Sequence, residues 1–224
     1  MLGIAERHHR KFGSLGPAII AAGTLISLWR YTRGGGDSHP FYYWPVSGLG
    51  DHNVAPWPAV FNLSIIAGAL CMALFLVGVG RSVGGRLTWA GVTLGIIAAF
   101  GLVGVGCFPS SPETLDIHYT SAGIAFIAAA LFAAGFALHL VIHRPPHFPQ
   151  WLALPSTLSM LCTAGLIFTV AVFVTGHKVQ VLEVNLLGIQ ISAIILLEWC
   201  AFISLPLWIM LTALAMRPNS TETA

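Results

Sequence analysis

The sequence predicts an all-α integral membrane protein, a single six-helix domain that takes up residues 1–224. Of the 224 residues, 56% are hydrophobic and only 8% are charged, and the mean hydropathy is +0.83. A soluble domain carries about 25% charged residues because its surface must stay hydrated. Lipid is therefore expected to be the solvent for most of this chain. The net charge of +2 is not concentrated in a Lys/Arg-rich tract, which argues against nucleic-acid binding.

Six apolar stretches are long enough to cross a bilayer, since a helix needs roughly 17–25 residues to do so. The expected spans are Leu15–Tyr31, Pro58–Gly80, Leu87–Cys107, Tyr119–Ile142, Trp151–Thr175 and Asn185–Met210. Proline and glycine inside them are compatible with helix in a membrane. The first stretch follows a basic flank but ends in Trp29-Arg30-Tyr31 without a small-residue cleavage pattern. It is therefore expected to be a retained helix and not a signal peptide.

The distribution of lysine and arginine predicts the orientation of the bundle. With the N-terminus inside, the cytoplasmic segments hold Arg7, Arg10, Lys11, Arg81, Arg86, Arg144 and Arg217. The outer segments hold only Arg30, Arg33 and Lys178. The positive-inside rule then places both termini in the cytoplasm. The expected location is a multi-pass position in a membrane, which would be the plasma membrane in a prokaryote.

Cysteine spacing gives no sign of a metal or redox site. Cys71, Cys107, Cys162 and Cys200 are far apart, and each lies in or beside an apolar run. Without a C-x-x-C pair, neither zinc binding nor thiol–disulfide chemistry is indicated. We expect no bound metal and no cofactor.

Histidine and carboxylate side chains gather in the loops predicted to face outward. The loop segments S-G-L-G-D-H (Ser47–His52), D-I-H-Y (Asp116–Tyr119) and G-H-K (Gly176–Lys178) come together at one face if the chain crosses the bilayer an even number of times. The candidate ligand-binding residues are Ser47, Asp51, His52, Asn62, His118 and His177, and the candidate catalytic residues are His118, Asp51 and Asp116. Such groups can coordinate a metal or carry out acid–base chemistry; alternatively, they only keep the loops hydrated. The long stretch between the first two spans, from Thr32 to Trp57, is expected to fold back onto the bundle.

Glu198 is the one acidic residue expected well inside a span. With the sixth span starting at Asn185, it lies about 13 residues along the helix, roughly 20 Å deep. Carboxylates at such depth tend to face the bundle interior and to mark function, and Gln190 lies on loosely the same side. The alternative is a protonated carboxyl group that bonds a neighbouring helix.

Three segments together resemble a known pattern: P-V-S-G-L-G (Pro45–Gly50), A-P-W-P-A-V-F-N (Ala55–Asn62) and the stretch from Gly104 to Ala122 that contains L-D-I-H-Y-T-S-A. In this order, the chain is similar to the prokaryotic membrane family called domain of unknown function 998 and to the eukaryotic Frag/DRAM/Sfk group. The resemblance implies six spans. It also implies that Ser47, Leu49, Gly50, Phe61, Asn62 and His118 are recurring positions. The eukaryotic relatives are associated with lipid remodelling and with lysosomal or autophagic membranes.

Three functions follow as hypotheses. The first is binding, or help in remodelling, of membrane lipids through an outer-facing polar pocket. The second is a lipid hydrolase or transferase in which His118 is the general base, oriented by Asp51 or Asp116. The third is a small transporter in which Glu198 changes protonation. The expected partners are membrane lipids, with a second copy of the chain or another membrane protein as a further possibility.

Overall fold

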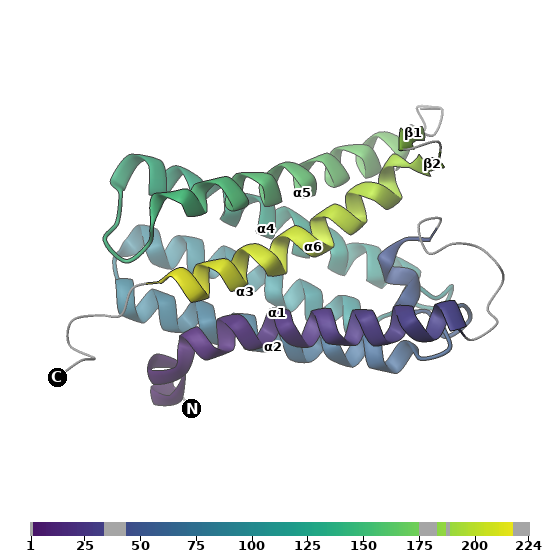
Figure 1. Ribbon diagram of the computed structural model, residues 1–224, viewed down its shortest axis with the longest axis horizontal. Coiled ribbons are helices and arrows are strands. Elements are labelled where there is room, and N and C mark those ends of the chain that lie inside the picture. The colour runs from purple at the N-terminus through teal and green to yellow at the C-terminus, as the bar shows by residue number, and fades with distance from the viewer. Residues whose placement is uncertain (1, 34–43, 175–182, 187–188, 217–224) are drawn as a thin grey trace.

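The computed structural model describes residues 2–33, 44–174, 183–186 and 189–216, and it forms a bundle of six long helices (Figure 1). The helices are α1 (Leu2–Arg33), α2 (Pro58–Val83), α3 (Arg86–Cys107), α4 (Leu115–His143), α5 (Ala153–Val174) and α6 (Ala193–Ala215). Two 3₁₀ turns, η2 (Val46–Gly50) and η3 (Gln150–Leu152), lie in the connections. All six helices are long and apolar enough to cross a membrane. The predicted six long apolar helices are confirmed.

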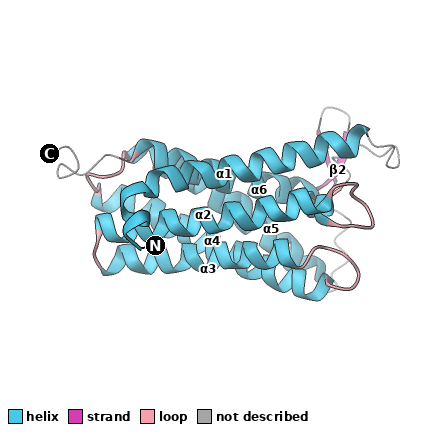
Figure 2. Cartoon of the chain, turned by 90° about the horizontal axis from the view of Figure 1, so that it is seen from below, coloured by secondary structure: helices cyan, strands magenta, loops and turns pink. Residues whose placement is uncertain are grey.

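The helices form a closed ring. Each helix packs against its neighbours in the sequence, and α6 packs against α1 (Figure 2). The interface of α1 and α2 is close because small residues face one another: a Cβ atom added at Gly68 would lie 2.7 Å from the carbonyl oxygen of Gly16. Close backbone approach is how helices associate where lipid competes for apolar contacts.

Helix α6 starts later than the sequence analysis expects. The expected span began at Asn185, but residues Glu183–Leu186 and Ile189–Ser192 form an antiparallel pair of short strands, β1 and β2, and the helix begins at Ala193. The sequence E-V-N-L-L-G-I-Q-I-S alternates polar and apolar residues around a glycine, which is the pattern of a hairpin. The average hydropathy of residues 183–192 does not reveal this alternation.

Both ends of the chain's helical part meet at one end of the bundle. The guanidinium group of Arg10 on α1 donates hydrogen bonds to the carbonyl oxygens of Ala213 (3.2 Å) and Leu214 (3.3 Å) on α6. The hairpin of β1 and β2 lies at the opposite end (Figure 1). The two ends of the described helical part therefore lie at the same end of the bundle, as an even number of crossings requires.

The long connection between α1 and α2 folds back onto the bundle where it is described. We call residues Trp44–Ala55, which include η2, the plug. Within it Val46 and Leu49 are buried (3% and 6% exposed), and η2 packs against α1, α2 and α6. The end of the bundle that carries this segment is called the plug end below.

Candidate functional site

The plug is fixed to α6 by two hydrogen bonds from neighbouring residues. The backbone N–H of Ser47 donates to Oε1 of Glu198 at 3.0 Å, and the indole N–H of Trp199 donates to the carbonyl oxygen of Trp44 at 3.2 Å. Because α6 begins at Ala193, Glu198 lies five residues from the helix start, about 8 Å along it. The expectation that this carboxyl group lies roughly 20 Å deep is wrong. It lies near the plug end and binds a loop backbone.

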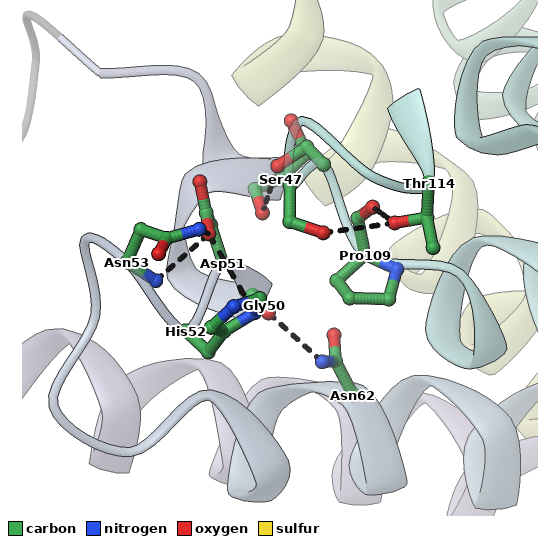
Figure 3. Close-up of polar contacts among 10 residues, drawn as sticks. Ser47, Gly50, Asp51, His52, Asn53, Asn62, Pro109 and Thr114 are labelled. Atoms are coloured by element: carbon green, nitrogen blue, oxygen red, sulfur yellow. Dashed lines mark hydrogen bonds and ion pairs between the residues drawn. The ribbon is translucent and has the colours of Figure 1, made fainter. Parts of the chain in front are cut away.

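The plug is also tied to α2 through Asn62. The side-chain amide of Asn62 donates from Nδ2 to the carbonyl oxygen of Gly50 at 3.0 Å (Figure 3). A Cβ atom added at Gly50 would lie 2.3 Å from Oδ1 of Asn62 and 3.2 Å from the ring of Phe61. Glycine is therefore required at position 50 by close approach to this amide.

A third attachment comes from the connection between α3 and α4. The hydroxyl group of Ser110 donates to the carbonyl oxygen of Ser47 at 3.1 Å. Figure 3 shows this connection lying across from the plug, with Thr114 bonded to the carbonyl oxygen of Pro109. Residues far apart in the sequence thus meet at η2, which is held from several sides.

Asp51 shapes the plug from within. The residue is buried, and its Oδ1 atom accepts hydrogen bonds from the backbone N–H (2.9 Å) and the side-chain Nδ2 (3.1 Å) of Asn53. Such a turn, closed by an aspartate side chain, is typical of loops. His52 is exposed, and its Nδ1 lies 4.0 Å from Oδ1 of Asp51.

His118 is buried (4% exposed) at the start of α4, and its Nδ1 lies 2.8 Å from the carbonyl oxygen of Phe108, the residue that caps α3. Because a carbonyl oxygen only accepts, Nδ1 carries the proton. The last carbonyl groups of a helix lack partners within the helix, and His118 supplies one.

The acidic residues beside His118 are exposed to solvent. Asp116 lies in the first turn of α4, where a negative charge is favoured by the helix dipole. Glu113 is exposed, and hydrogen bonds from its own backbone and from Ser111 lower the pKa of its carboxyl group. In the described part of the chain, the hydrogen bond of the His118 ring goes to a backbone carbonyl group and the bonds of the Asp51 carboxylate go to Asn53.

Two of the candidate residues are described only partly or not at all. His177 lies outside the described residues. Gln190 lies in β2, paired with Asn185 of β1, and only its backbone is described. Among the side chains that are described, no three His, Cys, Asp or Glu residues lie close enough together to hold a metal ion.

Below the plug, the ring of helices encloses an apolar cavity. The ring of Phe202, one turn below Glu198, stacks on that of Phe61 (centroids 5.9 Å apart). The cavity begins at Phe202. Its lining is apolar and comes from α1, α2, α3, α4 and α6; it includes Ile20, Ile65, Ala98, Ala129, Phe202 and Trp208. The cavity volume is about 60 Å³, and the cavity is partly open to the outside of the bundle.

Sequence reasoning missed Ser110 and Trp199, because a serine in a polar loop and a tryptophan in an apolar run carry no special signal. It singled out Glu198 for its charge but placed it at the wrong depth. It also gave no sign of the cavity, whose lining residues resemble any other apolar helix positions.

A family model described as "Protein of unknown function (DUF998)" matches residues 14–217. That range takes in all of α2 to α6, the plug and most of α1. Neither the search of curated proteins nor the search of solved structures found a match. The chain therefore belongs to the DUF998 family of proteins of unknown function.

Proposed function

We propose that this protein binds a membrane lipid by taking part of an acyl chain into the cavity inside the helix ring. The observation that carries the proposal is the apolar lining contributed by five helices. An apolar cavity offers no hydrogen bonds to water and so tends to stay dry, whereas a hydrocarbon chain would fill it favourably at about 0.8 kcal/mol per buried CH₂ group.

The size of the cavity limits what enters. A cavity volume of about 60 Å³ admits a narrow chain segment and not a whole lipid. Ions and polar solutes would find no partner along this lining, because transferring a charge into apolar surroundings is costly. This favours lipid binding over a transport path through the middle of the ring.

The polar residues at the plug end have a supporting role in this proposal. Ser47 and Asn62 are bonded within the protein, through Glu198 and Gly50 respectively. They hold the plug at this end of the ring, where Gly50 approaches Phe61. His52 is exposed and is available to contact a headgroup. By the positive-inside rule, we place the plug end outside and both termini in the cytoplasm.

Filling the cavity tests the proposal. Ala98→Leu adds three carbon atoms to a cavity-lining residue of α3, and Ala129→Leu does the same on α4. Ala90→Leu is the matched control, because Ala90 is an exposed position of α3. Native mass spectrometry of gently extracted protein should show bound lipid in the wild type and in Ala90→Leu.

Lipid should be lost from both cavity variants while their thermal unfolding midpoints stay near the wild-type value. Wild-type protein that carries no lipid, or cavity variants that keep it in full, would contradict the proposal. Co-purified metal together with lipid hydrolysis that His118→Ala abolishes would instead favour the enzyme hypothesis.

A further inference from the structure

Two arginine side chains lie one turn apart at the plug end of α1, and each lies against a tryptophan ring. The guanidinium carbon of Arg30 lies 5.4 Å from the ring centroid of Trp57, and that of Arg33 lies 5.3 Å from the ring of Trp29. Contacts of this kind hold the cation over the negative face of the ring. Residues three apart share one helix face, so the two charges are close together.

These charges have no acidic partner in the described part of the chain. The ion pair described there joins Asp51 and His52, and no carboxylate of the described residues lies within 4.0 Å of either arginine. Arg30 is half-buried, and its Nε atom is buried without a hydrogen-bond acceptor among the described residues. A cationic group with an N–H that lacks an acceptor is in an unfavourable state, so an anion bound beside this guanidinium group would be stabilising.

The start of α2 adds to the positive potential at this point. Trp57, which contacts Arg30, is the residue that caps α2, and its side chain makes no capping hydrogen bond. The N-terminus of a long helix carries partial positive charge and attracts anions. Elsewhere at this end, Asp51 is bonded to Asn53, Glu198 is bonded to Ser47, and Glu113 lies in the connection between α3 and α4.

We propose that Arg30 and Arg33 bind the phosphate group of a membrane phospholipid. Arg30 lies against Trp57 at the start of α2, and Arg33 lies against Trp29 of α1. Trp29 and Trp57 are about half exposed, as tryptophan is at the level of lipid headgroups. Guanidinium groups pair well with phosphate because their N–H groups match its oxygen atoms.

The position of the cavity agrees with a phosphate at this site. Arg30 lies ten residues from the cavity-lining Ile20 along α1, about 15 Å at ~1.5 Å per residue. One leaflet of a bilayer is about half of the ~30 Å hydrocarbon thickness. A phospholipid whose phosphate contacts Arg30 would thus bring its chain to the depth of the cavity. The inference rests on the proposed function for the lipid, and it adds the chemistry of the headgroup.

The test uses full-length protein in nanodiscs that contain phosphatidylglycerol and diacylglycerol with the same acyl chains. Native mass spectrometry then reports which of the two is retained. We expect wild-type protein to retain more phosphatidylglycerol than diacylglycerol. In Arg30→Gln/Arg33→Gln the ratio of the two retained lipids should fall about tenfold, as expected for the loss of one or two charge-assisted hydrogen bonds. Arg86→Gln, an exposed arginine at the opposite end, is the control and should keep it. Thermal unfolding midpoints check that every variant is folded.

The outcomes separate the two proposals. If the double variant keeps the wild-type preference while Ala98→Leu loses lipid, the phosphate site is wrong and lipid binding stands. If Ala98→Leu lowers the retained amounts of both lipids equally, and the arginine variant changes only the ratio between them, both proposals stand.

A third arm uses inorganic phosphate alone. If phosphate raises the unfolding midpoint of the wild type but not that of the arginine variant, and no lipid is retained, the site binds free phosphate and the lipid proposal fails. Wild-type protein that retains no lipid and does not respond to phosphate would overturn both.

Discussion

At the plug end, the backbone of a connecting segment is fixed by side chains of α2, α6 and the connection between α3 and α4, which supply Asn62, Glu198, Trp199 and Ser110. At the opposite end, the interior is filled instead by apolar side chains. There the ring of Phe136 packs against those of Phe148 and Trp208, with centroids 5.3 and 5.5 Å apart. Two polar contacts occur there as well: that of Arg10, and the hydrogen bond from the buried hydroxyl group of Ser156 to the carbonyl oxygen of Ala133 (2.8 Å).

The difference follows from what each end must enclose. A connection that crosses the ring buries backbone N–H and C=O groups, and each one needs a partner. The plug therefore needs specific polar residues, whereas the aromatic packing at the other end needs volume and apolar surface. Substitutions at the plug end should accordingly cost more than polar substitutions at the opposite end, and three predictions test this.

The largest effect is expected at Gly50. Gly50→Ala places a methyl group within 2.3 Å of Asn62 Oδ1, so the free energy of unfolding should fall by about 2–3 kcal/mol, as overpacking does. Thermal and denaturant unfolding in detergent measure it. In Gly50→Ala/Asn62→Ala the loss should be smaller than the sum of the single losses by about 1 kcal/mol, because the clashing atom is gone. Additive losses would mean that the amide is not what excludes a side chain here.

A smaller effect is expected at Glu198. Glu198→Leu leaves the Ser47 N–H without its acceptor, which should lower the free energy of unfolding by about 1–2 kcal/mol. Glu198→Gln keeps an oxygen atom that can accept the same hydrogen bond and should stay within about 0.5 kcal/mol of the wild type. Equal losses in the two variants would show that the charge, and not the acceptor, is what matters, and would revive the transporter hypothesis.

The smallest effect is expected at the opposite end. Arg10→Met removes the hydrogen bonds to Ala213 and Leu214 but keeps an apolar stem. Because this site is partly open to solvent, the loss should be only about 0.5–1 kcal/mol. Lys11→Met, at the exposed neighbouring position, controls for the lost charge. A loss at Arg10 as large as that at Gly50 would break the contrast between the two ends.

The sequence was sufficient to predict the helices but not the role of the polar residues. Low charge content and six long apolar runs predict a six-span bundle, because a bilayer admits few alternatives. The sixth boundary was wrong because hydropathy averages over the alternation in residues 183–192, where a hairpin precedes α6. Because of that error, Glu198 was predicted to lie deep in the membrane, whereas it lies near the plug end.

The polar residues Asp51, Asn62 and His118 were noticed by type, and the structure shows what their side chains contact. Asn62 and His118 bond backbone carbonyl groups, and Asp51 bonds Asn53. A sequence shows that a residue can form hydrogen bonds, but it does not show which partner reaches it.

By itself, then, the sequence determined that the chain forms six helices long and apolar enough to span a membrane, since composition and run length decide how a chain is solvated. Only the tertiary structure decided where the plug lies, which side chains fix it, and that five helices leave an apolar space between them. Those features depend on distances between residues up to 155 positions apart in the chain, as Trp44 and Trp199 are. The closing of the helix ring sets such distances, and no local pattern encodes them.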